Sequence, residues 1–147
     1  MYKMKYDLLN ATNNDIKYIK DAKIYNIFNY AHNLPKNEIL MINNYIDKNI
    51  SNQIPYYKLI TVNNIRVGCL LVIAKDDGVI LDEIYLDVDY RNKGIGTNII
   101  KAILEINPVV YLWVYKQNVK AVSLYKKMKF EIIEETDTRY YMRYSKR

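Results

Sequence analysis

A short glycine-containing turn, Arg91-Asn92-Lys93-Gly94-Ile95-Gly96-Thr97, carries the residues best suited to chemistry. It follows a strand-like segment and precedes a helical pattern, and a helix N-terminus presents free backbone N–H groups and the positive end of the dipole. Gly94 and Gly96 allow a ligand to approach the backbone closely, while Arg91 and Lys93 add positive charge. We expect a phosphate or pyrophosphate here; the alternative is a plain helix start with solvated charges.

Two familiar phosphate loops fit this turn less well. The Walker A loop has Gly-Lys-Ser/Thr at its end, whereas Lys93 precedes both glycines. The dinucleotide-binding fingerprint requires a third glycine, near position 99, and follows the first strand of a Rossmann unit. The turn at 91–97 follows the fourth strand-like segment of the chain, so a phosphate site of another kind is expected.

The composition fits one folded domain, residues 1–147. Half of the residues are apolar, which argues against disorder as the main state. The longest apolar runs, which begin at Cys69 and Pro108, are far shorter than the roughly 20 residues of a membrane helix. The N-terminal residues lack the apolar segment of a signal peptide. We therefore expect a cytoplasmic protein without a membrane partner.

The charge balance favours anionic ligands without naming one. The net charge is +6, with 17 Lys and 5 Arg. A small basic nucleic-acid-binding domain is one alternative, but five scattered arginines form no patch for bidentate base contacts. One cysteine, Cys69, and one histidine, His32, cannot supply the usual ligands of a zinc site, so no metal is expected. We expect Cys69 to be a small core residue.

The first half of the chain predicts a strand, two helices and a three-stranded meander. Thr12 and Asp15 have the spacing of a helix N-cap, and Pro35 suits the first turn of a second helix. Asn63-Asn64 and Asp76-Asp77-Gly78 are typical of hairpin turns. The strands are expected over 1–10, 56–62, 65–75 and 78–88.

The second half predicts a helix over 97–106, an apolar strand over 109–115, and a helix that buries Ala121, Leu124, Tyr125 and Met128. A closing hairpin over 130–135 and 139–144 follows. The two strands around the first of these helices should be parallel neighbours in a βαβ crossover. The apolar run at 109–115, with Trp113 in the core, is typical of a strand covered on both faces. The fold class is therefore α/β or α+β, a mixed sheet with helices on both faces.

Two motifs together resemble the GNAT superfamily of N-acetyltransferases. The first is Arg-x-x-Gly-x-Gly from Arg91, between a strand and a helix. The second is Asn118-x-x-Ala121-x-x-x-Tyr125 followed by Phe130. The resemblance covers residues 78–130; Lys129 departs from it, since relatives usually carry glycine there, and so does Val88, where many have proline. It implies a mostly antiparallel sheet of six or seven strands with four helices and splayed strands 4 and 5.

The same resemblance implies acetyl-CoA as acyl donor and assigns most of the site. The pyrophosphate would lie on the backbone amides of residues 92–97, with Asn118 helping to hold the donor. A backbone N–H of the fourth strand would polarise the thioester carbonyl, and Tyr125 would protonate the departing thiolate. The donor-binding residues are then Ile84, Tyr85, Leu86, Arg91, Asn92, Lys93, Gly94, Ile95, Gly96, Thr97, Asn118 and Tyr125.

The acceptor amine must lose a proton, and a nearby carboxylate could accept it. Asp82 and Glu83 are the candidates; alternation sends them to opposite faces, and family acids more often share the parity of Asp82. Either could instead bind a cationic acceptor or be merely solvated. His32 lies in a region that shapes the acceptor site in relatives, although a loop histidine is typically solvent-exposed.

We thus expect direct transfer of acetyl to a primary amine in a ternary complex, without metal. The acceptor would be a small-molecule or peptide amine, the protein a monomer or homodimer, and nucleic acid a disfavoured partner. The alternatives are a GNAT-like module that binds CoA or a partner without catalysis, and the basic nucleic-acid-binding domain.

Overall fold

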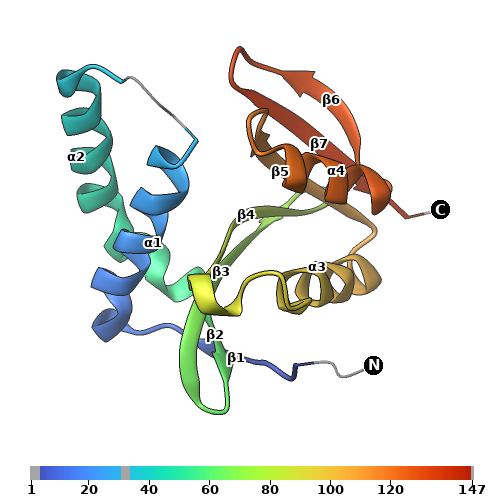
Figure 1. Ribbon diagram of the computed structural model, residues 1–147, viewed down its shortest axis with the longest axis horizontal. Helices are drawn as coiled ribbons and strands as arrows, with labels where there is room; N and C mark the ends of the chain where they lie inside the picture. The colour runs from blue at the N-terminus through green and yellow to red at the C-terminus, as the bar shows by residue number, and fades with distance from the viewer. Residues whose placement is uncertain (1–3, 31–33, 147) are drawn as a thin grey trace.

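The computed structural model describes residues 4–30 and 34–146. These residues form a seven-stranded sheet, four α-helices and three short 3-10 helices (Figure 1). The strands are β1 (Asp7–Asn10), β2 (Tyr57–Val62), β3 (Ile65–Lys75), β4 (Gly78–Leu86), β5 (Val109–Tyr115), β6 (Glu131–Glu135) and β7 (Arg139–Ser145). The helices are η1 (Asn13–Asp15), α1 (Ile16–Phe28), α2 (Lys36–Gln53), η2 (Ile54–Tyr56), η3 (Val88–Tyr90), α3 (Ile95–Ile106) and α4 (Val119–Lys127).

The sheet has the order β1-β2-β3-β4-β5-β7-β6. Only β4 and β5 pair in parallel among the described strands, and α3 connects them. The predicted βαβ crossover and the mostly antiparallel, mixed sheet with helices on both faces are confirmed. The strand predicted over 1–10 is shorter, Asp7–Asn10, and residues 1–3 lie outside the described residues.

Several predicted turns and caps have the expected local geometry. The Thr12 hydroxyl accepts from a backbone N–H while the Asp15 carboxylate accepts from the Thr12 N–H, which completes a capping box. Asn63 and Asn64 both have positive φ, 52° and 65°, as a two-residue hairpin turn of type I′ requires. Helix α3 begins at Ile95, two residues before the predicted start, because the glycine turn itself opens the helix.

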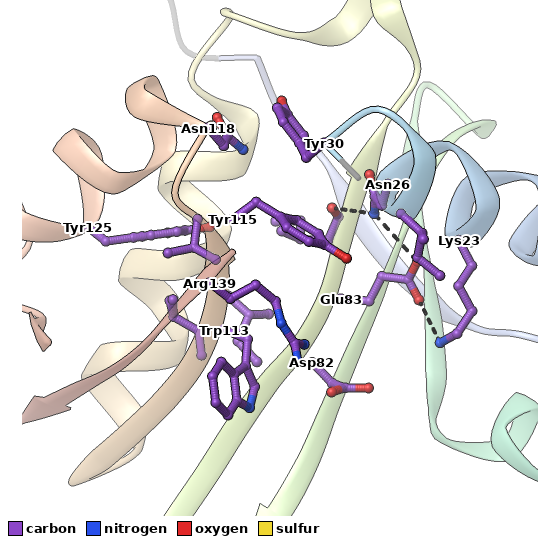
Figure 2. A pocket seen from close by; sticks show the side chains of 15 residues that line it. Lys23, Asn26, Tyr30, Asp82, Glu83, Trp113, Tyr115, Asn118, Tyr125 and Arg139 are labelled. Atoms are coloured by element: carbon purple, nitrogen blue, oxygen red, sulfur yellow. Dashed lines mark hydrogen bonds and ion pairs between the residues drawn. The ribbon is translucent and has the colours of Figure 1, made fainter. Parts of the chain in front are cut away.

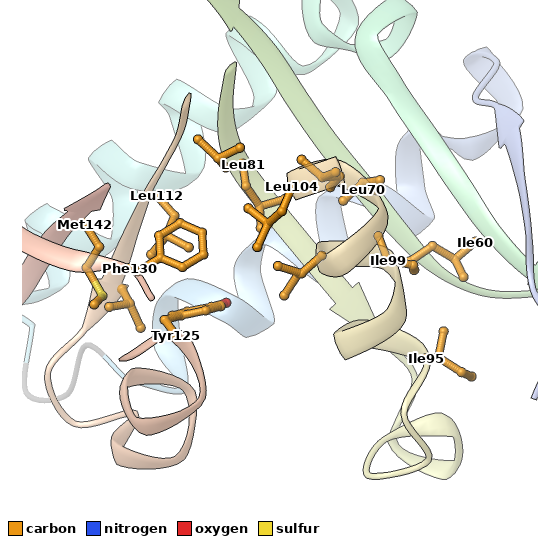
Figure 3. Packing of buried hydrophobic residues seen from close by; sticks show 14 of the residues in the cluster. Ile60, Leu70, Leu81, Ile95, Ile99, Leu104, Leu112, Tyr125, Phe130 and Met142 are labelled. Atoms are coloured by element: carbon orange, nitrogen blue, oxygen red, sulfur yellow. The ribbon is translucent and has the colours of Figure 1, made fainter. Parts of the chain in front are cut away.

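The helices cover the sheet in two separate layers (Figure 1). On one face, Ile19 of α1 and Ile50 of α2 pack over Tyr57 and Cys69, which confirms Cys69 as a core residue. On the other face, the buried residues of α3 and α4 pack over the middle of the sheet (Figure 3). The larger cluster includes Ile60, Leu70, Leu81, Ile95, Ile99, Leu104, Leu112, Tyr125, Phe130 and Met142.

A β-bulge in β4 opens the sheet. Leu71 of β3 lies opposite Glu83 and the next residue, Val72, lies opposite Leu81, so Asp82 is an extra residue without a counterpart on β3. Pairing between β4 and β5 ends at Leu81–Leu112. Since a bulge bends and twists its strand, the rest of β4 leaves β5, and the expected splay of these two strands is confirmed.

One core prediction is wrong. Trp113 of β5 is 37% exposed, although the apolar run at 109–115 was expected to be covered on both faces. Its even-numbered neighbours Leu112 and Val114 are buried beneath α3 and α4, whereas Trp113 points to the opposite face. There its ring contacts the Arg139 guanidinium, 4.7 Å from the ring centroid, instead of a helix.

Candidate functional site

The splay between β4 and β5 leads into two adjoining cavities. One, of about 910 Å³, runs along the glycine turn between β4 and the start of α4. The other, of about 360 Å³, lies between α1, β4 and β5. Asn26, Tyr30, Ile84, Asn118 and Tyr125 line both cavities, so the cavities meet around these side chains. We refer to the larger as the turn cavity and to the smaller as the sheet cavity.

The glycine turn has the geometry of an anion site. The first backbone hydrogen bond of α3 runs from the Asn98 N–H to the Gly94 carbonyl, so the three N–H groups before it, those of Ile95, Gly96 and Thr97, have no acceptor within the helix. Gly94 has φ of 87°, which favours glycine. A Cβ on Gly96 would meet Leu86 Cδ1 only at 3.8 Å, so protein packing does not require this glycine. The free amides, the helix dipole and the open space fit a phosphate.

The basic residues near the turn also brace it. Arg91 Nε donates to the Leu86 carbonyl at 2.7 Å, and its Nη1 donates to the Tyr25 hydroxyl at 2.9 Å. Lys120 of α4 donates to the Asn92 side-chain oxygen across the turn cavity. Arg91 therefore joins the turn to β4 and α1, while Lys120 brings positive charge from the opposite wall.

Beyond Leu81, β4 is no longer paired with β5, and every second residue of β4 directs its backbone groups into the gap between the two strands. The Asp87 N–H donates to Val67 of β3 at 2.7 Å, so by alternation Tyr85 also directs its backbone to β3, while Ile84 and Leu86 direct theirs to the gap. The Ile84 carbonyl accepts from Asn26 at 3.4 Å. The backbone N–H groups of Ile84 and Leu86 therefore point into the gap without a partner on β3, whereas Tyr85 contributes to the site through its side chain alone.

Asn118 and Tyr125 lie at the junction of the two cavities (Figure 2). The Asn118 side chain caps α4 by accepting from the Ala121 N–H at 3.3 Å, which leaves its NH₂ group for other contacts. Tyr125 is buried, and this burial raises the pKa of its hydroxyl to about 12, with a smaller contribution from Tyr30. The hydroxyl is therefore a proton donor throughout the neutral range.

Glu83 lies in the wall of the sheet cavity, only 8% exposed (Figure 2). Its Oε2 accepts from the Tyr57 hydroxyl and lies 3.4 Å from Lys23 Nζ, while Oε1 accepts from Asn26 at 3.4 Å. Burial raises the pKa of the Glu83 carboxyl, and the Lys23 ammonium and the Tyr57 hydroxyl oppose this rise. Glu83 raises the Tyr57 pKa in turn, second to burial.

Asp82 also lines the sheet cavity, at its exposed rim with Trp113 and Arg139 (Figure 2). The expectation that alternation sends Asp82 and Glu83 to opposite faces, so that at most one would face the cleft, is therefore wrong, because both line this cavity. Regular alternation fails here because Asp82 is the bulged residue. At a bulge, two successive side chains no longer point to opposite faces of the sheet.

The sequence interpretation missed Lys23, Asn26 and Tyr57 as members of the site. Lys23 interrupts the apolar face of α1, and this break was the available signal for a partner in the interior. Tyr57 could not be separated from the other fifteen tyrosines by sequence alone. His32 lies outside the described residues.

Among residues 4–30 and 34–146, no group of three or more His, Cys, Asp or Glu side chains is arranged to hold a metal ion. Over the same ranges, none of the helices has both the length and the apolar character needed to cross a membrane.

Comparison with known proteins identifies the same family that the motifs at 91–97 and 118–130 resemble. A family model described as "Acetyltransferase (GNAT) domain" matches residues 55–132, more than half of the chain. The peptidyl-lysine N-acetyltransferase YjaB of Salmonella typhimurium is 31% identical over 78 residues, which are 53% of this chain and 51% of that protein. The match therefore spans about half the length of this curated relative.

Solved structures share the fold across nearly the whole chain. The PaiA N-acetyltransferase of Thermoplasma acidophilum in complex with coenzyme A has a TM-score of 0.74 at 17% identity, covering 97% of this chain and 99% of that one. Arabidopsis thaliana Naa50 with a bisubstrate analogue has a TM-score of 0.62 at 22% identity, covering 95% and 98%. At these identities the likeness shows the fold alone.

Proposed function

Because the chain belongs to the GNAT acetyltransferase family, we propose that it transfers the acetyl group of acetyl-CoA directly to a primary amine, with both substrates bound at once. One observation carries the proposal: the turn cavity, with its free amides, adjoins the sheet cavity, with its buried carboxylate, around Tyr125. Two openings that converge on one proton donor suit a two-substrate transfer. Residues 1–147 would act as one domain, and a cytoplasmic location stays a prediction.

The donor side would use the turn and the free edge of β4. The N–H groups of Ile95, Gly96 and Thr97 would bind phosphate oxygens, with Lys120 and Lys93 adding positive charge. The N–H groups of Ile84 and Leu86 would donate to the extended arm and to the thioester oxygen. Bound acetyl-CoA would supply an activated acetyl group as a thioester. Coenzyme A in the PaiA complex supports this choice of ligand.

The proton transfers would use two buried groups on opposite walls. Tyr125 would donate a proton to the leaving sulfur, since a thiol of pKa near 8.5 is a poor leaving group as a bare anion in a dry site. We assign Glu83, rather than Asp82, as the group that accepts the proton of the acceptor amine, directly or through water. Glu83 is buried and fixed by three donors, whereas Asp82 is exposed at the rim and suits contact with the acceptor's outer part.

The acceptor would be a small-molecule or peptide amine that enters through the rim formed by Asp82, Trp113 and Arg139. Two similar proteins support an amine of a peptide: YjaB is a peptidyl-lysine N-acetyltransferase, and the Naa50 structure holds the bisubstrate analogue CoA-Ac-MVNAL. The oligomeric state, monomer or homodimer, stays a prediction.

The test is a screen of amine acceptors that measures release of the CoA thiol. Polyamines, amino acids, aminoglycosides, lysine peptides and peptide N-termini are compared with a blank that lacks acceptor. Acceptor-dependent release, with the acetylated product identified by mass spectrometry, supports the proposal. Binding of acetyl-CoA without transfer to any acceptor would favour the non-catalytic module. Oligonucleotide binding that weakens steeply with salt would favour the nucleic-acid-binding alternative.

A further inference from the structure

Three polar groups from two elements converge on the Glu83 carboxylate. Lys23 and Asn26 come from neighbouring turns of α1, and Tyr57 comes from the start of β2. Oε2 accepts from the Tyr57 hydroxyl and lies 3.4 Å from Lys23 Nζ; Oε1 accepts from the Asn26 amide at 3.4 Å. Each carboxylate oxygen therefore has a donor on the α1 side of the sheet (Figure 2).

Lys23 is an unusual occupant of its position. It lies on the inner face of α1 between the apolar residues Ile19 and Ile27, and its side chain is only 17% exposed. Burying an ammonium group is costly unless it is paired. A buried ion pair is also weak evidence for stability, because an apolar pair of similar volume is often as stable or more so. Because Lys23 and Glu83 both line the sheet cavity, the pair can act on a substrate bound there.

The surroundings of Glu83 leave Lys23 as its close positive partner. Asp82, next to it on β4, is a like charge, and Cys69 of β3 and Tyr57 of β2 are neutral groups. Arg139 lines the opposite side of the cavity, on β7, and forms none of the described contacts with Glu83. Burial and Asp82 favour the protonated carboxyl, whereas Lys23 favours the carboxylate.

We propose that Lys23 is a positioning residue that keeps the Glu83 carboxylate ionised and fixed in the cavity wall, ready to accept the proton of the acceptor amine. The inference rests on the proposed function. In the step, an N–H bond of the acceptor ammonium breaks, an O–H bond forms on Glu83, and the nitrogen keeps the electron pair that attacks the thioester. A carboxyl that is already protonated cannot take part, so the charge of Lys23 sets the lowest pH at which the step proceeds.

The experiment measures kcat/KM against pH for four proteins: wild type, Lys23→Met, Lys23→Arg and Lys20→Met. Lys23→Met keeps the length of the side chain without its charge, and Lys23→Arg restores the charge. Lys20 is the matched control, since it lies one turn earlier on α1 and pairs with Asp47 of α2, away from the cavity. A second, activity-free measurement follows the Glu83 carboxyl by carbon NMR, assigned by loss of its signal in Glu83→Gln.

We expect Lys23→Met to move the acidic limb of the profile upward by roughly one pH unit or more, as for loss of an opposite charge within about 4–6 Å. At high pH its kcat/KM should return to within a few-fold of wild type. Lys23→Arg should restore most of the shift, and Lys20→Met should superimpose on wild type. The Glu83 titration should move upward by a similar amount in Lys23→Met.

The proposal is overturned if the Glu83 carboxyl titrates alike in wild type and Lys23→Met. It is also overturned if Lys23→Met loses kcat/KM equally at every pH and the acidic limb of the profile does not move. Lys23 would then have a structural role only. If wild type transfers acetyl to no acceptor, the proposed function has failed, whereas the NMR titration still decides whether Lys23 controls the ionisation of Glu83. The two failures are therefore distinguishable.

Discussion

Tyr125 and Phe130 are joined twice, once through the backbone and once through their rings. The Phe130 N–H donates to the Tyr125 carbonyl at 3.0 Å, and the two ring centroids are 5.6 Å apart in an edge-to-face arrangement. The Lys129 N–H donates to the Lys126 carbonyl at 3.0 Å. These two bonds and the apolar contact form a Schellman motif at the end of α4. The motif that ends the helix thus also fixes the proposed proton donor.

Replacing Lys129 with glycine should stabilise the protein. Lys129 has φ of 77°, in the left-handed region that a Schellman motif requires and that costs most residues about 1–2 kcal/mol. Glycine avoids this cost but loses roughly 0.5–1 kcal/mol through its greater freedom in the unfolded chain. We expect a net gain of about 0.5–1 kcal/mol, measured by denaturant unfolding.

Asn64→Gly is the control for Lys129→Gly. Asn64 also has positive φ, 65°, but asparagine tolerates this region better than lysine. The control should therefore gain less than Lys129→Gly. An equal gain at both positions would mean that strain at Lys129 is not the cause.

Tyr125→Phe should lower turnover by roughly 10²–10⁴-fold, the usual contribution of general acid catalysis. The ring, its contact with Phe130 and nearly all of its buried area are kept, so stability and donor affinity should change little. Because the Tyr125 pKa is raised to about 12, wild type should show no loss of activity from this group on the alkaline side below about pH 11. Single-turnover kinetics measures the chemical step directly.

Tyr144→Phe serves as the control, since Tyr144 also contacts Phe130 but lines neither cavity. It should retain wild-type turnover. If Tyr125→Phe matches wild type in single turnover, another group or water protonates the thiolate.

The sequence was sufficient for the order of elements and for the glycine turn. Both follow from local rules: hydrophobic period, capping residues, and residues that tolerate positive φ, as at Asn63 and Asn64. The family resemblance implies glycine at position 129, and the φ of 77° at Lys129 is one that glycine adopts without strain.

The bulge at Asp82 could not be predicted, and it determines the site. Strict alternation placed Asp82 and Glu83 on opposite faces. One extra residue in β4 opposite β3, however, reverses the face to which every earlier side chain of the strand points. The break that Lys23 makes in the apolar face of α1 signals a buried partner but does not identify it, since Lys23 and Tyr57 lie 60 and 26 residues from Glu83 in the chain. Long-range pairs of this kind depend on how α1 packs on the sheet, which no local pattern encodes.

Gly96→Val should weaken binding of acetyl-CoA by roughly tenfold or more, equivalent to about 1.4 kcal/mol, and should leave the fold intact. The first new carbon would lie 3.8 Å from Leu86 Cδ1 and 4.0 Å from Ile84 Cδ1, so the protein has room for it, but it would extend into the turn cavity. Isothermal titration calorimetry on the folded variant is the measurement.

Two further variants separate the phosphate site from backbone effects. Ala102→Val places the same side chain on the exposed part of α3 and should bind acetyl-CoA like wild type. Gly94→Ala should lose stability because of its φ of 87°, although a Cβ there would meet only Asn98 Nδ2, at an ordinary contact distance of 4.0 Å. If Gly96→Val binds acetyl-CoA with unchanged affinity, the turn is not the phosphate site.

Asp82→Asn and Glu83→Gln should affect different kinetic constants, although the two residues are adjacent. Glu83→Gln removes the proposed proton acceptor and should lower kcat by roughly 10²–10⁴-fold. Asp82→Asn removes an exposed charge at the rim, so for a cationic acceptor KM should rise by about 2–5-fold with kcat nearly unchanged, the size expected of an exposed ion pair. Steady-state kinetics at a fixed, saturating donor concentration measures both. The reverse result, a loss of kcat in Asp82→Asn alone, would move the base to Asp82 and leave the ion pair of Lys23 and Glu83 a structural one.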